Sequence, residues 1–317
     1  MDPALRERFA ADLGELIAPN VRIGVAVSGG PDSLALLLLA NAVRPGLVEA
    51  ATIDHRFREE SRGEAEMVAD LCARLGVPHA ILTARWEDLP ESAIQERARK
   101  ERYRLLAYWA EERRLGALAT AHHAEDQAET LLMRLARGSG VKGLAAMRRK
   151  AVTPGAHLRL ARPLLAWRRA ELEQVCVEAG VVPARDPSNV DERFERVRVR
   201  RVLHDSDIDA AAIARSAANL AAADDALDWA ATMEWKSRVA ERHGAYSYSP
   251  DDAPAEVVRR VIGRALRKLG TEGDRDLRGP ELDRLLATLR DGGTATLRGV
   301  LCRGGREWRF TRAPARN

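Results

Sequence analysis

The sequence predicts an α/β fold, with a parallel sheet covered by helices on both faces, followed by a smaller and mainly helical domain. Three observations support this. Short apolar segments alternate with segments of helical length through the first half of the chain, as in parallel strands joined by helices. A glycine-rich turn at 28–33 directly follows the first apolar segment. From residue 206 onward the chain is Ala-rich, with apolar residues at helical spacing. We therefore predict domains at 1–205 and 206–317.

The first domain is expected to contain strands separated by helices. The strands are short runs rich in Val, Ile, Leu and Ala, at 21–27, 48–53, 79–83 and 117–120. Several of the helices end near a Gly, a common helix stop; they are expected at 4–17, 34–42, 64–75, 91–114 and 122–137. Ligands bind beyond the carboxyl ends of parallel strands. The residues that follow these strands, Ser28, Asp54 and His122, are therefore expected to share one cleft.

The second domain is expected to be mainly helical. Residues 206–243 place apolar side chains among polar ones at helical spacing and predict long helices. Two further helices are expected at 255–270 and 280–290. Residues 294–311 alternate loosely between apolar and polar, which predicts a short hairpin.

Composition indicates a soluble globular protein. The chain has 317 residues, of which 46% are hydrophobic and 31% are charged, enough for two domains with sizeable cores. The sequence has no apolar run long enough to span a membrane and no signal peptide at its start. Its three cysteines, Cys72, Cys176 and Cys302, are far apart, which suggests neither a disulfide framework nor a metal site. We expect a cytoplasmic protein with no membrane partner.

The positive charge is clustered, although the net charge is only +4. A first cluster lies within residues 130–170, which contain ten Lys and Arg and no acidic residue. Two more clusters lie at 193–201 and at 298–316. Such clusters suit a nucleic-acid backbone, and the alternative is an ordinary solvated, Arg-rich surface. The second cluster lies at 193–201, and its members expected to bind RNA are Arg196, Arg198, Arg200 and Arg201.

The glycine-rich loop (residues 28–33) predicts an anion site. Gly29 and Gly30 permit positive φ and close approach to a ligand, and Pro31 suits the first position of a helix. Free amides at the helix start, with Ser28 and Ser33 beside them, can bind phosphate. The loop has no Lys, so it is not the GxxxxGK[ST] loop. A strand-turn-helix corner without a ligand is the alternative.

Asp54 and His55 follow the second strand, where they can meet a nucleotide or a metal. A pair that merely caps the loop is nearly as good an interpretation. Gln95, Arg99 and Arg102 share one helix face, which by itself indicates only a solvated stripe.

The start of the last helix of this domain is acidic. Asp126 and Glu129 (the acid pair) are three residues apart, so both lie on one face near the positive end of the helix. They can bind a cation, or simply stabilise the helix start. His122 and His123 precede them, but adjacent residues point in different directions, so a two-histidine metal site is a weak interpretation.

These motifs resemble a known family. Ser28-Gly29-Gly30-Pro31-Asp32-Ser33 is similar to the signature of the N-type ATP pyrophosphatases, and the remaining motifs resemble the short form of the bacterial tRNA(Ile)-lysidine synthetases. The resemblance covers residues 23–201. Its pieces are 52–55, 96–103, His122-His123 with Asp126-Gln127-Ala128-Glu129-Thr130, 134–140, 143–144, 162–165 and Asp186-Pro187-Ser188-Asn189.

The resemblance implies a two-step ligation on tRNA(Ile) with a CAU anticodon. ATP adenylates the C2 oxygen of the wobble cytidine and pyrophosphate leaves. The ε-amine of L-lysine then attacks C2 and AMP leaves. The product, lysidine, changes decoding from AUG to AUA and tRNA identity from Met to Ile. A homodimer is an open expectation for the assembly.

The resemblance also implies roles for particular residues. ATP binding falls to the glycine-rich loop, Asp54 and His55, with Asp32 as a ligand of Mg²⁺. Lysine binding falls to Arg102, Asp126 and Glu129, and the catalytic residues are Asp32, Arg102 and Asp126. Two positions depart from the family pattern. Arg56 stands where the family usually has Gly, and Val197 stands where it usually has Asn.

Three other functions compete with this one. A tRNA 2-thiolation enzyme of the same superfamily would share the ATP site, but it typically needs paired cysteines. A small-molecule amidotransferase-type ligase would not need the arginine clusters. A non-catalytic RNA-binding protein would leave the glycine-rich loop and the acid pair unexplained.

Overall fold

The computed structural model describes residues 2–56, 60–84, 94–184, 193, 195–270 and 279–314. The chain divides into two compact units, Met1–Ala221 (unit 1) and Ala222–Asn317 (unit 2). The division falls within one long helix, α9 (Ala210–Arg238), and therefore lies later in the chain than the predicted boundary at 205/206.

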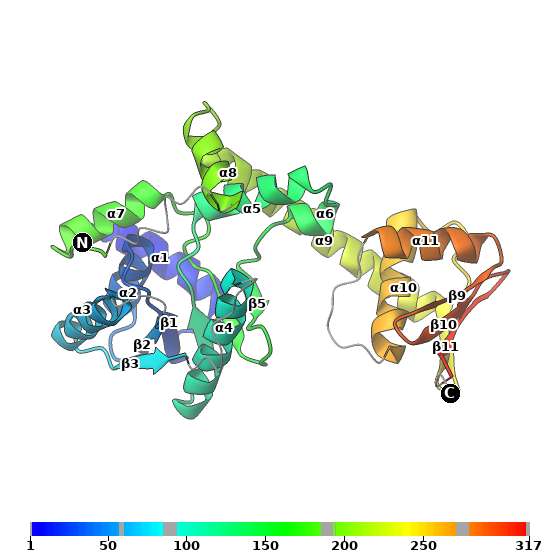
Figure 1. Cartoon of the computed structure of the whole chain (residues 1–317), viewed down its shortest axis with the longest axis horizontal. Coiled ribbons are helices and arrows are strands. Elements are labelled where there is room, and N and C mark those ends of the chain that lie inside the picture. The colour runs from blue at the N-terminus through cyan, green and yellow to red at the C-terminus, as the bar shows by residue number, and fades with distance from the viewer. Residues whose placement is uncertain are drawn as a thin grey trace. The chain divides into compact units, whose positions relative to one another are not determined.

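The first unit is built on a mainly parallel sheet (Figure 1). Among the described residues, its strand order is β3-β2-β1-β4-β6-β5. All neighbouring pairs are parallel except β5 with β6. The strands are β1 (Ile23–Ala26), β2 (Val48–Asp54), β3 (His79–Thr83), β4 (Ala117–Ala119), β5 (Lys150–Val152) and β6 (Arg159–Ala161). The predicted parallel sheet and its first four strands are confirmed, and β5 and β6 were not predicted.

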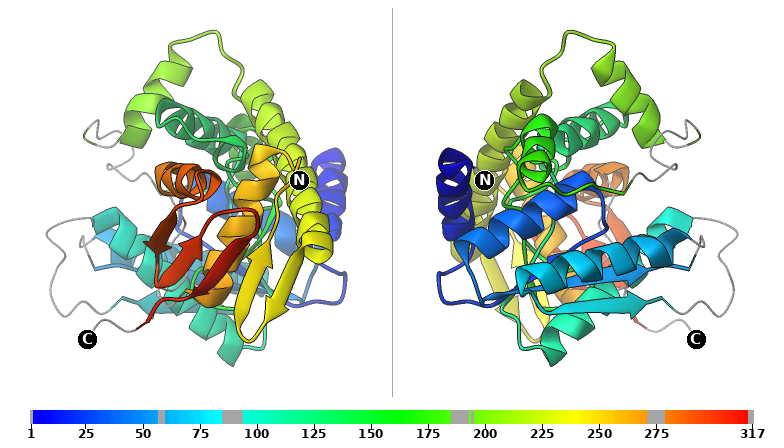
Figure 2. Two further views of the ribbon diagram at one scale, coloured as in Figure 1. Left: turned by 90° about the vertical axis from the view of Figure 1, so that its right-hand side faces the viewer. Right: turned by 90° about the vertical axis from the view of Figure 1, so that its left-hand side faces the viewer.

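Helices cover both faces of this sheet, as the sequence predicts. One core joins the sheet to four helices: α1 (Pro3–Leu16), α2 (Pro31–Val43), α3 (Glu60–Leu75) and α7 (Arg169–Glu178). The right-hand view of Figure 2 shows the blue helices of this layer in front of the strands. On the other face a second core contains Tyr103, Leu106 and Trp109 of α4 (Ile94–Glu112).

Gly24 allows α4 to lie close to the sheet. A Cβ at this position of β1 would lie 2.6 Å from the Trp109 ring, so only Gly fits there. Trp109 is 5% exposed, and burying an aromatic ring of this size gives a large part of the packing energy of such a face.

The carboxyl ends of three adjacent strands bring the predicted site residues to one edge of the sheet. β1 runs into the glycine-rich loop and then α2, and β2 ends at Asp54. β4 leads to His122 and His123, and the helix α5 (Ala124–Ala136) follows. The short helix α6 (Val141–Leu144) comes next in the chain. Since β1 lies between β2 and β4, Ser28 is expected between Asp54 and His122 along this edge.

The helix α8 (Glu195–His204) was not predicted, and α9 was predicted with different bounds. Residues 206–243 were expected to be helical throughout, but α9 starts at Ala210 and ends at Arg238. In unit 1, Ile213, Ala217 and Leu220 of α9 pack with Leu131 of α5 and Ala146. None of the helices in the described part of the chain is long and apolar enough to cross a membrane.

The second unit combines helices with an antiparallel sheet (Figure 1). In its described part, five strands are ordered β7-β8-β11-β10-β9; the left-hand view of Figure 2 shows them in yellow to red. They are β7 (Val239–Arg242), β8 (Ala245–Tyr248), β9 (Thr294–Leu297), β10 (Val300–Arg303) and β11 (Trp308–Arg312). One core joins them to α10 (Ala255–Leu269) and α11 (Gly279–Arg290).

This sheet is larger than the hairpin that the sequence predicted. The loose alternation over 294–311 is in fact three strands, and two more come from a segment that we expected to be helical or unassigned. The reason is the turn His243-Gly244, in which both residues have positive φ (52° and 71°). Successive positive φ values form the tight turn that joins two antiparallel strands, and a His-Gly pair is a weaker signal for it than Asn-Gly.

Candidate active site

The glycine-rich loop has the geometry that the sequence predicts at Gly29 and Pro31. Gly29 has φ of 87°, which disfavours any residue with a Cβ, whereas Gly30 has extended backbone and caps α2. Pro31 is the first residue of the helix. The Ser33 hydroxyl donates to the Gly30 carbonyl oxygen (3.0 Å) and accepts the Ser28 N–H (3.1 Å). These bonds close the loop around the amino end of α2, where an anion is favoured.

Asp32 suits a single Mg²⁺ contact. Its Oδ1 atom is buried and has no hydrogen-bond partner among the described residues. A buried carboxylate oxygen without a partner is costly, and a cation would remove that cost. Mg²⁺ commonly binds one or two carboxylates together with substrate phosphates. The described residues contain no cluster of three or more His, Cys, Asp or Glu that could hold a metal by themselves. The residues present therefore fit a magnesium ion that arrives with a nucleotide.

His123 stands in the middle of the acidic side chains. Its Nε2 lies 3.5 Å from an oxygen of Asp32 and 3.5 Å from an oxygen of Asp126, and its Nδ1 lies 2.8 Å from Glu125. The His123 side chain is 6% exposed. Burial by itself would lower the pKa of His123, but Asp32, Glu125 and Asp126 outweigh burial and raise this pKa to about 10. The imidazole is therefore charged at neutral pH.

The acid pair is in contact with two arginines of α8. Arg196 donates from Nε to Glu129 (2.5 Å) and from Nη2 to Asp126 (2.7 Å), and Arg200 donates from Nε to Glu129 (2.7 Å). The Glu129 side chain is only 1% exposed, and a buried carboxylate without such partners is strongly destabilising. Burial would lower the pKa of Arg200, but the Glu129 contact outweighs it and raises this pKa. The pair is thus a built site for cationic groups.

A second group of charges lies around His122 and is positive. Burial, and then the charges of Arg162, Arg102, Arg99 and Arg196, lower the pKa of His122 well below its usual value. His122 is therefore neutral, and its Nδ1 lies 3.0 Å from the Thr120 hydroxyl. Burial also lowers the pKa of Arg102. A neutral histidine next to the buried Arg162 and three further arginines favours a negatively charged ligand at this position.

Asp54 and His55 lie beside this positive group. Burial and then Arg102 lower the pKa of His55. The Asp54 carboxylate accepts the Arg56 N–H (2.9 Å), as in the loop-capping interpretation. Arg56 has φ of 54°, the left-handed conformation that favours Gly. This explains why Gly is usual at this position in the family that the sequence resembles. Val197, the other departure, is a half-buried residue of α8.

The expected site residues therefore fall into two groups. One group consists of Asp126, Glu129, Arg196 and Arg200, which contact one another, and of Asp32, which is linked to Asp126 through His123. Arg102 and His55 belong to the positive group. Arg198 and Arg201 are exposed on α8 and do not contact the acid pair. The motif 186–189 lies outside the described residues, as does the side chain of Gln95.

Sequence reasoning missed three residues of the site, His123, Glu125 and Arg162. The histidine pair was noted only as a weak metal site. The signal that could have found His123 is its place: it directly precedes α5 as its N-cap, with acidic residues two and three positions later.

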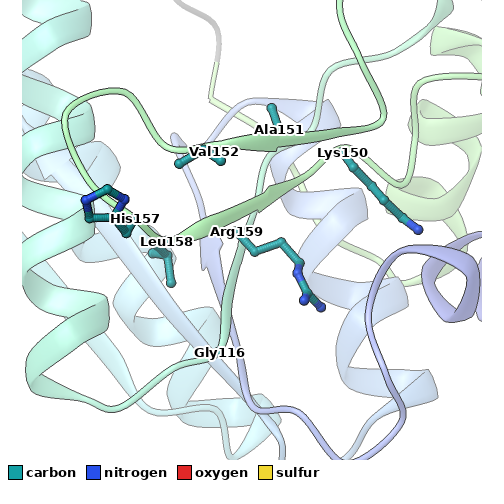
Figure 3. Close-up of a pocket in the computed structure, with 7 residues that line it drawn as sticks. All are labelled: Gly116, Lys150, Ala151, Val152, His157, Leu158 and Arg159. Atoms are coloured by element: carbon teal, nitrogen blue, oxygen red, sulfur yellow. The ribbon is translucent and has the colours of Figure 1, made fainter. Parts of the chain in front are cut away.

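A separate pocket of about 530 Å³ lies away from these residues. It is lined mainly at the amino ends of β4 and β6, by Gly116, Lys150, Ala151, Val152, His157, Leu158 and Arg159. Figure 3 shows the Lys150 and Arg159 side chains on one side of the β5–β6 hairpin and His157 on the other. None of the expected site residues lines this pocket.

The fold and the loop define a class of protein. A parallel sheet with helices on both faces, and a phosphate-binding glycine-rich loop after its first strand, is the architecture of the PP-loop ATP pyrophosphatases. A family profile described as "PP-loop domain" matches residues 4–206. The U34-tRNA thiolase NcsA from Methanococcus maripaludis, solved with its 4Fe-4S cluster, is similar with a TM-score of 0.57. The match has 16% identity, covers 68% of this chain and 77% of that one, and shows the fold alone.

Sequence relatives narrow the class to one family. The chain is 49% identical over 311 residues to a tRNA(Ile)-lysidine synthase of Novosphingobium aromaticivorans, covering 97% of this chain and 93% of the relative. It is 43% identical over 318 residues to a tRNA(Ile)-lysidine synthase of Zymomonas mobilis, covering 99% and 95%. The chain belongs to the tRNA(Ile)-lysidine synthase family and is a ligase. The resemblance stated from the motifs is confirmed.

Proposed function

We propose that this protein converts the wobble cytidine of tRNA(Ile) with a CAU anticodon into lysidine, with ATP and free L-lysine as the other substrates. In the first step the C2 oxygen of the cytidine attacks the α-phosphorus of ATP, and pyrophosphate leaves. In the second step the ε-nitrogen of lysine attacks C2, the bond from C2 to the adenylate oxygen breaks, and AMP leaves. Both steps need anion binding and cation binding within one site.

The observation that supports this proposal most is that the glycine-rich loop and the acid pair lie next to each other, on either side of His123. The glycine-rich loop suits the phosphates of ATP, and the acid pair suits a cationic amino acid. Asp32 of the first and Asp126 of the second are both 3.5 Å from the same imidazole nitrogen. Nucleotide and amine would therefore bind side by side, as transfer from one to the other requires.

In this proposal the glycine-rich loop binds the phosphates; its residues are Ser28, Gly29, Gly30, Pro31, Asp32 and Ser33. Asp54 and His55 bind the nucleotide from the end of β2. Asp32 would hold the Mg²⁺ that accompanies ATP. That ion supplies charge neutralisation for the departing pyrophosphate. Arg102 would stabilise negative charge that develops on the reacting groups, since a guanidinium keeps its positive charge at neutral pH.

Asp126 and Glu129 would bind lysine, with Arg102 nearby. They already bind guanidinium groups of α8, so their geometry suits N–H donors. An incoming ammonium would share or replace these donors. Asp126 is also the residue we propose to help deprotonate the attacking amine, because it belongs to the pair but is less buried than Glu129.

We further propose that residues 1–205 form the catalytic part and that 206–317 serve tRNA binding. The exposed arginines of α8, Arg198 and Arg201, suit phosphate contacts. Arg196 and Arg200, which we also expected to bind tRNA, contact the acid pair and would reach tRNA only if those contacts changed.

Thiolation of tRNA is the less favoured function. All three cysteines are buried as free thiols. Burial raises the pKa of Cys72 and Cys176 to about 11 and that of Cys302 to about 12. A thiolation enzyme needs reactive thiolates, which have lowered pKa values and some exposure.

The test is nucleoside analysis of a CAU-anticodon tRNA transcript after incubation with the protein, ATP, Mg²⁺ and labelled L-lysine. Label in a modified cytidine, dependent on all three substrates, is the expected result. A transcript with a GAU anticodon is the matched control and should remain unlabelled. Sulfur incorporation, or no modified nucleoside, would contradict the proposal.

A further inference from the structure

His123 occupies an unusual position for the N-cap of a helix. N-caps are commonly Ser, Thr, Asp or Asn, whose side chains accept an N–H from the first turn of their own helix. His123 instead contacts two elements: its Nε2 lies near Asp32 of α2 and Asp126 of α5, and its Nδ1 is 2.8 Å from Glu125. The ring thus lies between the phosphate side of the site and the acid pair.

The orientation of the His123 ring is fixed by the contact of its Nδ1 with Glu125. The Glu125 carboxylate oxygen that contacts Nδ1 also accepts the N–H of Arg169 at the start of α7 (3.0 Å). The Asp126 carboxylate in turn accepts the His123 N–H (3.1 Å). A ring held at one nitrogen by a carboxylate points its other nitrogen in a defined direction, and here that direction is toward Asp32 and Asp126.

One N–H faces two carboxylates at equal distance. At 3.5 Å each, neither contact has the 2.7–2.9 Å length of a full charge-assisted hydrogen bond. A shared donor of this kind keeps two negatively charged groups next to each other that would otherwise repel. It also responds when one of them acquires a cation, because the N–H is then drawn to the other.

We propose that His123 is a positioning residue, whose Nε2–H aligns Asp32 of the glycine-rich loop with Asp126 of the acid pair. It acts through these two carboxylates and touches neither substrate. The inference rests on the proposed function only for the names of the substrates, since the alignment itself concerns residues of this chain.

The central variant is His123→Asn. Asn is among the best N-cap residues, so α5 should still start at the same place, while the side chain is too short to reach both carboxylates. We expect kcat for lysidine formation to fall by roughly 10- to 100-fold, with KM for ATP and lysine changed by less than about threefold. His79→Asn is the matched control. His79 lies in β3, and its Nε2 is 2.9 Å from the Thr52 hydroxyl. It is therefore a hydrogen-bonded histidine of the same unit, in the strand at the end of the sheet order, three positions from β4, which leads to His123. It should leave kcat unchanged.

A double-mutant cycle separates positioning from general destabilisation. In an Asp126→Asn background, His123→Asn should lower kcat by less than threefold, because the carboxylate on which it acts is gone. Equal losses in both backgrounds would overturn the proposal.

A direct readout does not depend on turnover. Nitrogen NMR of histidine-labelled protein, with the His123 signal identified by its loss in His123→Asn, reports the partner of Nε2. Addition of Mg²⁺ and ATP should shift this signal, and the shift should be much smaller in Asp126→Asn. An unmoved signal would overturn the proposal. If the wild-type protein makes no lysidine but the signal shifts as expected, the proposed function fails and the role of His123 stands.

Discussion

The two units of this molecule place their polar side chains differently. Of the buried polar and charged residues in the described chain, only Asp224 belongs to unit 2; unit 1 has all the others, among them Asp54, His123, Glu129 and Arg162. The core of unit 2 is apolar and aromatic, with Tyr248, Trp308 and Phe310 almost fully buried. Burying charge costs free energy and is retained where it has a use. Chemistry is therefore expected in unit 1, and unit 2 is expected to act through its surface.

Asp224, the buried acid in the described part of unit 2, has a structural use. Asp224 pairs with Arg260 of α10 (2.7 Å), and Arg260 also pairs with Asp228 (2.5 Å) and Glu256 (3.0 Å). The bonds to Asp224 and Asp228 join the middle of α9 to α10. In unit 1, by contrast, Asp32 keeps one buried oxygen without a partner in the described residues. The buried carboxylate of Asp224 is used in a structural ion pair, whereas that of Asp32 has an oxygen left for a ligand.

The largest effect is expected from Asp32→Ala. Without this carboxylate, the charges of the metal and of the departing pyrophosphate are unbalanced, so pyrophosphate release should fall by more than about 10³-fold. The fold should persist, with an unchanged circular dichroism spectrum. Asp70→Ala, an exposed acid of α3, is the control. Ordinary ATP consumption by the folded Asp32 variant would remove Asp32 from the site.

Trp308→Ala should break unit 2 and spare unit 1. The Trp308 side chain is 2% exposed and packs edge-on against Tyr248 (6.1 Å between ring centroids). Its removal should lower the free energy of unfolding of unit 2 by about 3–5 kcal/mol. Urea unfolding with limited proteolysis checks this: new cleavage should map to residues 222–317. Equal loss of protection in both units would show that the two cores do not fold separately.

Glu129→Gln should weaken lysine binding without affecting ATP. Loss of one charge-assisted hydrogen bond is worth roughly 1.5–3 kcal/mol, or about 10- to 150-fold in KM for lysine. Asp126→Asn should act similarly, and more severely if Asp126 also accepts the proton. The measurement is a lysine titration at saturating ATP and tRNA, with Glu111→Gln on the surface as control. Variants that bind lysine normally but lose ATP affinity would assign the acid pair to the nucleotide.

Arg201→Glu is expected to have the smallest effect of these four. Arg201 is exposed on α8, and its Nε lies 3.6 Å from Asp205. Reversal of its charge should weaken tRNA binding by roughly fivefold at moderate salt and reduce the salt dependence by about one counterion. Filter binding across a salt series, with Arg6→Glu of α1 as control, checks this. An unchanged salt slope would place the RNA surface elsewhere.

Most of unit 1 could be predicted because its signals are local. The apolar runs of β1, β2 and β4 are fully or largely buried, and the Gly and Pro residues of the loop 28–33 predict its turn without reference to the rest of the chain. The strands β5 and β6 could not be predicted in this way. Each has only three residues, and the first of them is charged, Lys150 in β5 and Arg159 in β6, so no apolar run or alternation marks these strands.

The candidate site shows a second limit. Which residues come together at the strand ends follows from the order of strands, but the partners of each charge depend on tertiary contacts. Arg196 and Glu129 are 67 positions apart in sequence and 2.5 Å apart in the fold. Charge patterning alone therefore assigned Arg196 to RNA with Arg198, whereas the fold turns these two neighbours on α8 toward different surroundings.

The contact between α8 and the acid pair has a consequence for amino-acid selectivity. If the acid pair binds the amino-acid substrate as we propose, carboxylates that already accept the guanidinium groups of Arg196 and Arg200 would also accept the side chain of free arginine. Discrimination would then come after binding: an amine can give up its proton and attack C2, whereas a guanidinium stays protonated and is a poor nucleophile. Free arginine is in this view a competitor that occupies the site without being consumed, and fidelity comes from chemical reactivity.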